Sequence, residues 1–346
     1  LLNGAHHGSE FVSIDAVMDA IEVLLLRSSS KADPTLRRDP KLDKSVRRFL
    51  DELVIWCVPV VNPDGVWAAM QPNGVRTGRK NGRDTDENGR IDLMDGVDLN
   101  RNYPFRWGAL GEIGSSSKPQ SYYYRGTQPA SEPETQAMMK LAESEHFAAS
   151  ISYHTGSVAV LAPYTIDNVV DPTPNEAWMV GEHVVAGMPP HPQKKPFVLK
   201  RKLYSVDGTD QDYYRGTFGT VALLVEGARR DPKDDVERLA VVRAVRPTWV
   251  RLFERFVDGP AVSIVVRDAA GHPVVAEVAV EEMVAHEGER YSTRCRDGRV
   301  DRYLPAPGRY NILVKAAGQN EPTRHPVEVT AGRTQLDIVL PQAKGG

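Results

Sequence analysis

The amino-acid sequence predicts an α/β fold, with a mixed, mostly parallel sheet flanked by helices, followed by a small all-β sandwich at the C-terminus. Over residues 1–256, amphipathic helical patterns alternate with continuous apolar runs, as expected for a sheet that helices cover. Residues 261–340 show short alternating runs separated by turn residues, which is typical of a sandwich. The pattern changes at Asp258-Gly-Pro260, so we expect one domain over residues 1–258 and another over 260–342.

The composition is ordinary for a soluble globular protein, with 41% hydrophobic and 26% charged residues in a chain of 346. The formal net charge of −3 gives no electrostatic case for binding nucleic acid. No apolar run in the sequence, residues 23–26 included, is long enough to span a membrane. The chain begins in an expected strand end that leads directly into polar residues, so we expect its true N-terminus to be missing.

The first ten residues contain a candidate metal site. His7 and Glu10 lie three positions apart after an apolar start and a Gly-bounded turn. A neutral imidazole and an ionised carboxylate reach one metal ion together if the backbone turns as it leaves a strand. Taken alone, this pattern is more often a solvated His beside a surface Glu, so the other polar residues must decide.

The remaining elements of the first domain follow from periodicity, caps and turns. Residues 13–27 form one apolar helical stripe, and 53–61 is a continuous apolar run that ends at the turn signal of 62–65. A capping box at 131–134 opens a helix to about residue 145. Further elements are expected as follows: strands over 147–153 and 217–225, and helices over 174–188 and 235–256. His154 and Glu226 come directly after the two strands, where ligands gather in such sheets.

Residues 72–108 have no hydrophobic periodicity, and so long a loop is usually functional. Part of it has the oxygen-ligand spacing of a calcium loop, with Gly89 at the sixth position. The candidate calcium ligands are Asp84, Asp86, Asn88, Arg90, Asp92 and Asp95. The last position is Asp where Glu is usual, and no amphipathic helices flank the loop, so a surface turn rich in Asp, Asn and Gly remains the alternative.

The same loop ends in Asn100-Arg101-Asn102, where an Arg between two amides can clamp a carboxylate. A solvated turn is the alternative at this position. Residues 204–212 form another segment rich in functional groups, at a loop or a helix start.

Together these motifs resemble the zinc metallocarboxypeptidases, in family order over residues 1–256. The motifs are His7–Glu10, Asn62-Pro-Asp-Gly65, Asp98–Asn102, Ser131–Thr135, Ser152-Tyr-His154, Tyr204 with Asp212, and Glu226. The C-terminal sandwich resembles the transthyretin-type domain of the regulatory branch of this family, represented by carboxypeptidases E, N and D. The resemblance implies a carboxypeptidase-type sheet in the first domain.

The resemblance also implies roles for individual residues. His7, Glu10 and His154 would bind one catalytic zinc ion and leave a position for water. Glu226 would act as the general base, which takes a proton from water and returns it to the leaving amine. Arg83, seventeen residues before Asn100, would stabilise the oxyanion, with Arg79 as the alternative.

Other residues would bind the substrate. Asn100 and Arg101 would hold its free carboxylate, Tyr204 would close over the terminal residue, and Gln211 and Asp212 would lie at or near the side-chain pocket. The regulatory branch has an Asp eleven residues after its third zinc ligand to bind basic side chains. This chain has Thr165 at that position and Asp167 nearby, which leaves a preference for Lys or Arg open.

The expected function is zinc-dependent hydrolysis of the C-terminal peptide bond of peptides or proteins. The resemblance also implies a secreted protein, either extracellular or periplasmic. Two alternatives remain: a carboxypeptidase that releases diaminopimelate from cell-wall peptides, and a catalytically inactive peptide-binding relative. The inactive relative would require a substitution among the zinc ligands or Glu226, and the sequence contains none.

Overall fold

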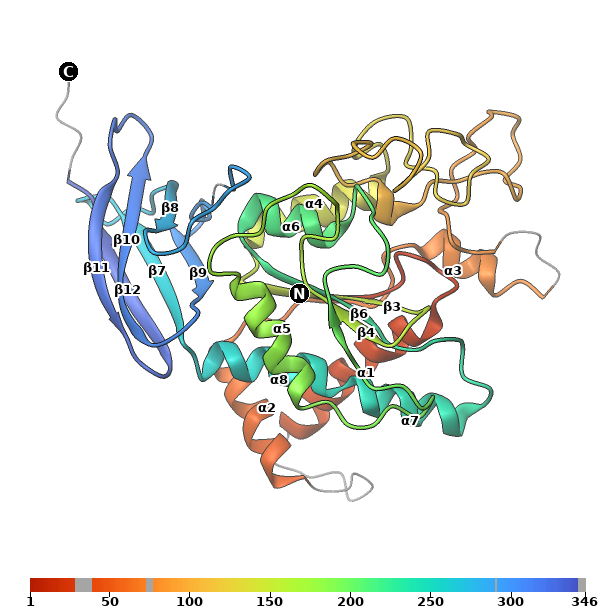
Figure 1. Cartoon of the computed structure of the whole chain (residues 1–346), viewed down its shortest axis with the longest axis horizontal. Coiled ribbons are helices and arrows are strands. Elements are labelled where there is room, and N and C mark those ends of the chain that lie inside the picture. The colour runs from red at the N-terminus through yellow and green to blue at the C-terminus, as the bar shows by residue number, and fades with distance from the viewer. Residues whose placement is uncertain (29–38, 73–76, 290, 342–346) are drawn as a thin grey trace.

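The computed structural model describes residues 1–28, 39–72, 77–289 and 291–341 (Figure 1). A six-stranded sheet with the order β2-β1-β3-β6-β4-β5 forms the centre of its larger part. The strands are β1 (Leu2–Asn3), β2 (Cys57–Val58), β3 (Ala149–His154), β4 (Ala159–Leu161), β5 (Leu199–Lys200) and β6 (Val221–Glu226). Only β4 and β6 pair in antiparallel fashion among these described strands, so the predicted mixed, mostly parallel sheet is confirmed.

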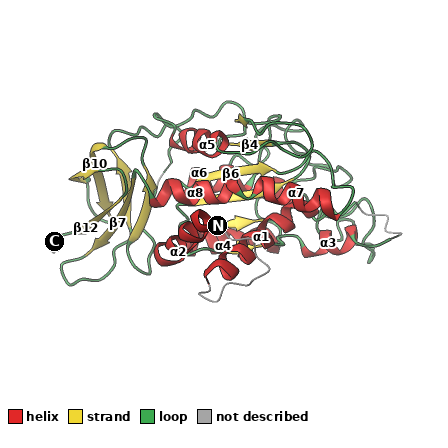
Figure 2. Cartoon of the chain, turned by 90° about the horizontal axis from the view of Figure 1, so that it is seen from below, coloured by secondary structure: helices red, strands yellow, loops and turns green. Residues whose placement is uncertain are grey.

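Helices cover both faces of this sheet (Figure 2). One face packs against α1 (Phe11–Ser28), α2 (Pro40–Glu52), α5 (Glu176–Ala186), α7 (Asp235–Val245) and α8 (Pro247–Val257). The other packs against α4 (Pro133–Glu145) and α6 (Asp210–Phe218). Along β6, Leu223 and Val225 point to the first face and Ala222 to the second, as the two-residue period of a strand requires. Burial on both faces explains why this strand is apolar from Val221 to Val225, before it ends at Glu226.

Several predicted boundaries differ from the structure. Within the apolar run 53–61, only Cys57–Val58 pairs as a strand, and this strand lies half-buried at the edge of the sheet. The turn predicted at 62–65 is wrong: Asn62 caps α3 (Pro63–Ala69), and its Oδ1 accepts from the Gly65 backbone N–H at 2.8 Å. Asn favours both turns and helix N-caps, so the residue type alone does not distinguish the two.

The helix predicted over 235–256 is two helices, because Pro247 has no backbone N–H to continue the first. Helix α2 was not predicted, although Leu42, Val46 and Phe49 recur at helical spacing and Val46 and Phe49 are buried. The loop over 72–108 is confirmed within its described part, apart from the short 3₁₀ helix η1 (Leu99–Arg101).

Residues 261–339 form two three-stranded sheets, β11-β10-β8 and β12-β7-β9, which confirms the predicted sandwich. The strands are β7 (Ala261–Arg267), β8 (Ala276–Val280), β9 (Arg299–Tyr303), β10 (Gly308–Ala316), β11 (Thr323–Val329) and β12 (Arg333–Val339). Side chains such as Ile264, Val278, Ile312 and Ile338 from both sheets make a separate core. The sequence did not indicate β9 and β11, whose charged residues weaken the apolar pattern.

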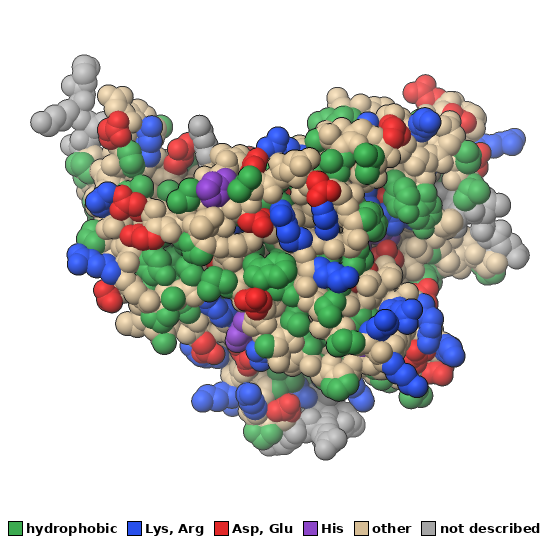
Figure 3. Space-filling model, in the orientation of Figure 1, with side chains coloured by type: hydrophobic (Ala, Val, Ile, Leu, Met, Phe, Trp, Pro, Cys, Tyr) green, Lys and Arg blue, Asp and Glu red, His purple; other side chains and the backbone are tan. Residues whose placement is uncertain are grey.

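A buried ion cluster joins the sandwich to the larger part. Glu176 of α5 accepts from Arg215 of α6 at 2.8 and 2.9 Å, and from Arg302 of β9 at 3.2 Å. On the face shown in Figure 3, acidic and basic side chains both occur over most of the surface. No helix among the described residues is long and apolar enough to cross a membrane.

Candidate metal centre and active site

The candidate site lies at the carboxyl ends of neighbouring parallel strands. β1 pairs with β3, and the segment after β1 carries His7 and Glu10. In the β3–β6 ladder, His154 is the direct partner of Glu226. β3 ends at His154 and β6 ends at Glu226, so the pairing of these two parallel strands brings both side chains to one edge of the sheet.

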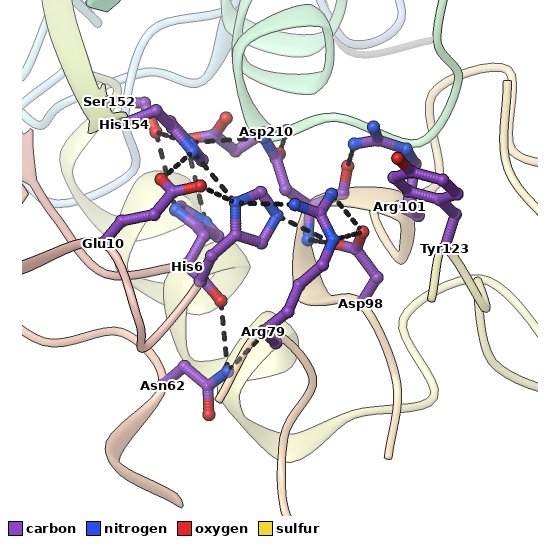
Figure 4. Close-up of polar contacts among 12 residues, drawn as sticks. His6, Glu10, Asn62, Arg79, Asp98, Arg101, Tyr123, Ser152, His154 and Asp210 are labelled. Carbon is purple, nitrogen blue, oxygen red and sulfur yellow. Dashed lines mark hydrogen bonds and ion pairs between the residues drawn. The ribbon is translucent and has the colours of Figure 1, made fainter. Parts of the chain in front are cut away.

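Three of these side chains form a candidate metal centre. The Nδ1 atom of His7 lies 2.8 Å from one carboxylate oxygen of Glu10, and Nδ1 of His154 lies 3.0 Å from the other. Figure 4 shows Glu10 and His154 converging, and the ligand atoms of the group all lie within 4.8 Å of one another. Two imidazoles and one carboxylate match the donor set of a catalytic zinc site with an open position, so these residues fit the ion.

The electrostatics of this group favour a cation. Burial alone would raise the pKa of the Glu10 carboxyl, but the imidazoles of His7 and His154 hold it well below its usual range. Burial would lower the pKa of His154, whereas the Glu10 carboxylate raises it. The ionised carboxylate therefore attracts positive charge between the two rings, where a metal ion would lie.

Asp98 orients the first imidazole. Its Oδ1 lies 3.1 Å from His7 Nε2, the ring nitrogen remote from the group, and also accepts from the Asn100 backbone N–H. Such a carboxylate fixes the tautomer and the direction of a metal-binding His. The sequence contained this residue within the Asp98–Asn102 motif, but only the fold reveals its contact with His7.

The structure places Arg79, and not Arg83, beside the metal group. Arg83 does not reach the metal group: its guanidinium pairs with Glu132 at 2.8 Å, and its side chain is 45% exposed. Arg79 is buried, donates to Asp98 at 2.9 and 2.6 Å, and places Nη1 3.3 Å from His7 Nδ1. The prediction of Arg83 relied on its sequence spacing to Asn100. Residues 84–95 form a loop between the two, so this spacing does not determine which arginine lies near the metal group.

A cavity opens beside the metal group and contains about 420 Å³ of unfilled space, part of it open to solvent. Its lining includes His154, Glu226, Asn100, Arg101, Tyr204 and Gln211. Arg101 is buried, and its Nη2 lies 3.4 Å from the Tyr204 hydroxyl. The side-chain amide of Gln211 is buried with no hydrogen-bond partner among the described residues, so both its N–H and its carbonyl remain available.

Asp212 is not among the residues that line the cavity, and its carboxylate instead binds Thr165, which is. Its carboxylate accepts from the Thr165 backbone N–H at 2.9 Å, the Thr165 hydroxyl at 2.7 Å and the Ile166 N–H at 3.2 Å. Burial raises its pKa to about 6, against these hydrogen bonds. Asp212 therefore positions Thr165, which lines the cavity. Asp167 forms an ion pair with Lys202, another residue of the cavity lining.

One neighbour of the metal group was not foreseen. His6 is fully buried, with Nε2 2.9 Å from the Tyr103 hydroxyl and its ring stacked on His154 at 5.8 Å. Burial lowers its pKa to about 4, so it is neutral near pH 7. A second His beside His7 carried no distinct signal in the sequence.

The loop over residues 84–95 brings together three of the predicted calcium ligands. The carboxylates of Asp84, Asp86 and Asp95 lie within 4.8 Å of one another, without Asp92. Asp84 accepts from the Gly89 N–H at 2.7 Å, and Asp95 accepts from the Thr85 N–H at 2.8 Å. These hydrogen bonds hold the loop by themselves, and calcium binding stays a prediction.

Comparisons with known proteins agree with this geometry. A family model described as "Zinc carboxypeptidase" matches residues 1–235. The chain is 37% identical over 123 residues to metallocarboxypeptidase A of Trichophyton rubrum, which covers 34% of this chain and 27% of that protein. It is 31% identical over 193 residues to carboxypeptidase O of Bos taurus, covering 55% and 44%. The chain thus spans less than half the length of these curated relatives.

Solved structures share the fold. Bovine thrombin-activatable fibrinolysis inhibitor, in complex with tick carboxypeptidase inhibitor, has a TM-score of 0.53 at 20% identity, covering 73% of this chain and 80% of that chain. Carboxypeptidase A of Helicoverpa armigera has a TM-score of 0.54 at 22% identity, covering 72% and 58%. Since the family match extends over more than half of the 346 residues, the chain belongs to the zinc carboxypeptidase family.

Proposed function

We propose that this protein is a zinc-dependent carboxypeptidase that hydrolyses the C-terminal peptide bond of peptides or proteins. One observation carries the proposal: a single cavity is lined by His7 and His154 of the metal group, by Glu226 and by the buried Arg101. A metal group and a base can serve many hydrolases, but a buried cation in the same cavity supports recognition of a free carboxylate.

His7, Glu10 and His154 would hold the zinc ion. When bound, zinc supplies Lewis acidity, which activates water and polarises a carbonyl. Glu226 would take the proton from water and deliver it to the leaving amine. Burial raises the pKa of Glu226, and one of its oxygens has no hydrogen-bond partner among the described residues, so this carboxylate is well suited to accept a proton.

The charged and polar donors would orient the substrate. Asn100 and Arg101 would bind its terminal carboxylate, with Tyr204 covering the terminal residue. Arg79 would stabilise negative charge on the carbonyl oxygen, because its guanidinium lies beside the metal group. An amidated or internal residue lacks the carboxylate, which would restrict cleavage to the last bond.

The side-chain pocket is best suited to neutral terminal residues. Gln211 offers an unpartnered amide, and Thr165 lines the same cavity. Glu226 is the only carboxylate among the described residues that line it, so a basic terminal side chain finds no dedicated partner. On the family resemblance, we also propose that the protein acts outside the cell or in a periplasm.

The test is release of terminal amino acids from a peptide library by the zinc-loaded protein. We expect single residues to be released, activity to stop with a chelator and to return with zinc. Peptides with an amidated C-terminus serve as the matched control and should stay intact. His154→Ala should lose zinc and activity together, since two ligands hold the ion poorly. Cleavage of amidated and free peptides at equal rates would refute the exopeptidase proposal.

A further inference from the structure

The sandwich reaches the catalytic part of the molecule through the segment between β8 and β9 (Figure 1). Val284 in this segment exchanges two backbone hydrogen bonds with Thr173, at 2.9 and 2.8 Å. Glu287 accepts from the Val170 N–H at 2.9 Å, and His286 lies 3.2 Å from the Thr173 hydroxyl. A sandwich segment is therefore paired, backbone to backbone, with the loop over residues 163–173.

The most buried contact in this pairing joins Tyr164 to Glu289. The Tyr164 side chain is fully buried, and its hydroxyl donates to Glu289 Oε1 at 2.9 Å. The Phe105 ring stacks on the Tyr164 ring with 5.1 Å between centroids. Glu289 is 9% exposed, and its other oxygen accepts from the Glu287 N–H. Each of these partners restricts the Tyr164 side chain to one position.

The residue after Tyr164 lines the cavity. Thr165 is held from the other side by Asp212 of α6, through its backbone N–H and its hydroxyl. The cavity wall at Thr165 is thus anchored by α6 on one side and, through Tyr164, by the sandwich on the other. Arg201 also donates to the Tyr164 backbone carbonyl at 3.0 Å, within the larger part of the molecule. His154 and Glu226 lie on β3 and β6, and His7 and Glu10 lie in the segment after β1, whereas the second anchor belongs to the sandwich.

We propose that Glu289 is a positioning residue that the sandwich contributes to the side-chain pocket. By fixing Tyr164 it fixes Thr165, and this wall determines how well a terminal side chain is accepted. The inference rests on the proposed carboxypeptidase function. Without the carboxylate, the buried hydroxyl loses its acceptor and the loop spends less time in the conformation that accepts a side chain. The apparent affinity for peptides with a terminal side chain then falls in proportion to the fraction of time that the loop spends in this conformation.

The experiment compares kcat and KM of the full chain for peptides that differ only in the last residue. With terminal leucine or glutamine, we expect Glu289→Ala to raise KM about tenfold, the effect of one hydrogen bond to a charged group. With terminal glycine, which has no side chain to reach Thr165, KM should not change. We expect kcat and zinc content to match the unmodified protein for every peptide.

Several variants separate positioning from general damage. Glu289→Gln keeps an acceptor oxygen and should restore KM, and Tyr164→Phe removes the same hydrogen bond while keeping the ring. Glu282→Ala removes a sandwich carboxylate that accepts from Asn311, and should behave as the unmodified protein. A KM that rises equally for glycine and leucine peptides, or does not rise at all in Tyr164→Phe, would overturn the proposal.

Binding of free leucine and free glycine by calorimetry tests the wall without chemistry. A loss of leucine affinity in Glu289→Ala with unchanged glycine affinity supports the inference even if no peptide is cleaved. Selective loss of leucine affinity without any peptide cleavage would reject the proposed carboxypeptidase function but keep the positioning role of Glu289.

Discussion

Replacing Arg79 by Met tests whether Arg79, rather than Arg83, stabilises the oxyanion. The substitution keeps the stem of the side chain and removes the guanidinium that donates to Asp98 and approaches His7. Loss of one donor to a developing oxyanion typically lowers kcat by about 10²- to 10³-fold. We expect a loss of this size in Arg79→Met, with zinc retained.

The same substitution should also lower stability. Arg79 and Asp98 are both buried, and breaking a buried ion pair costs about 3–5 kcal/mol because one charge loses its partner. Asp98 keeps its contacts with His7 and the Asn100 N–H, which places the expected loss near the lower end of that range. Denaturant unfolding gives this free energy, and kinetics must be measured where the variant is fully folded.

Arg83→Met is the matched control. Its guanidinium is 45% exposed and Glu132 is 1% exposed, so we expect this half-exposed pair to contribute less than the fully buried pair of Arg79 with Asp98. Glu132 also keeps donors from Asn81 and Ser131. We expect near-normal kcat and KM in this variant. The reasoning is refuted if Arg83→Met loses turnover a hundredfold while Arg79→Met remains active.

Three further outcomes are expected. Glu226→Gln should keep zinc and fold but lose about 10²- to 10⁴-fold in kcat, because the amide cannot accept the proton; near-normal turnover excludes it as base. Calcium at millimolar concentration should raise the melting temperature and lower KM if the acidic loop binds it, and Asp84→Ala/Asp86→Ala should abolish both effects; no response in either leaves only a surface turn. Glu176→Gln should cost about 3–5 kcal/mol of unfolding free energy. The difference in unfolding free energy between the unmodified protein and Glu176→Gln should be largest above about pH 4.5 and should shrink below it. Burial raises the pKa of Glu176, but Arg215 lowers it by more, so the ionised carboxylate stabilises the folded state until the pH falls through this lowered pKa.

The catalytic ends of β3 and β6 could be predicted from sequence, because a continuous apolar run followed by His154 or Glu226 contains both the strand and the chemistry. The choice of Arg79 over Arg83 could not be predicted, since both lie in a loop without periodicity. Its path depends on contacts such as Arg83 with Glu132, which join residues far apart in sequence.

The other failures have both local and long-range causes. Asn62 could cap a helix or form a turn, and only the Gly65 N–H at 2.8 Å decides between them. The pairing of Tyr164 with Glu289 spans 125 residues and crosses between the two parts of the chain. Neither residue has a neighbour in sequence that would reveal the contact.

On the proposed function, the direct pairing of His154 with Glu226 fixes the position of metal ligand and base independently of the loops that would bind the substrate. The spacing between ligand and base is set by the hydrogen-bonded ladder, in which adjacent strands lie about 4.8 Å apart. A one-residue insertion within either strand would turn one of these side chains to the opposite face. The surrounding loops carry no such constraint, so they can diverge and admit new peptides while the reacting groups keep their geometry.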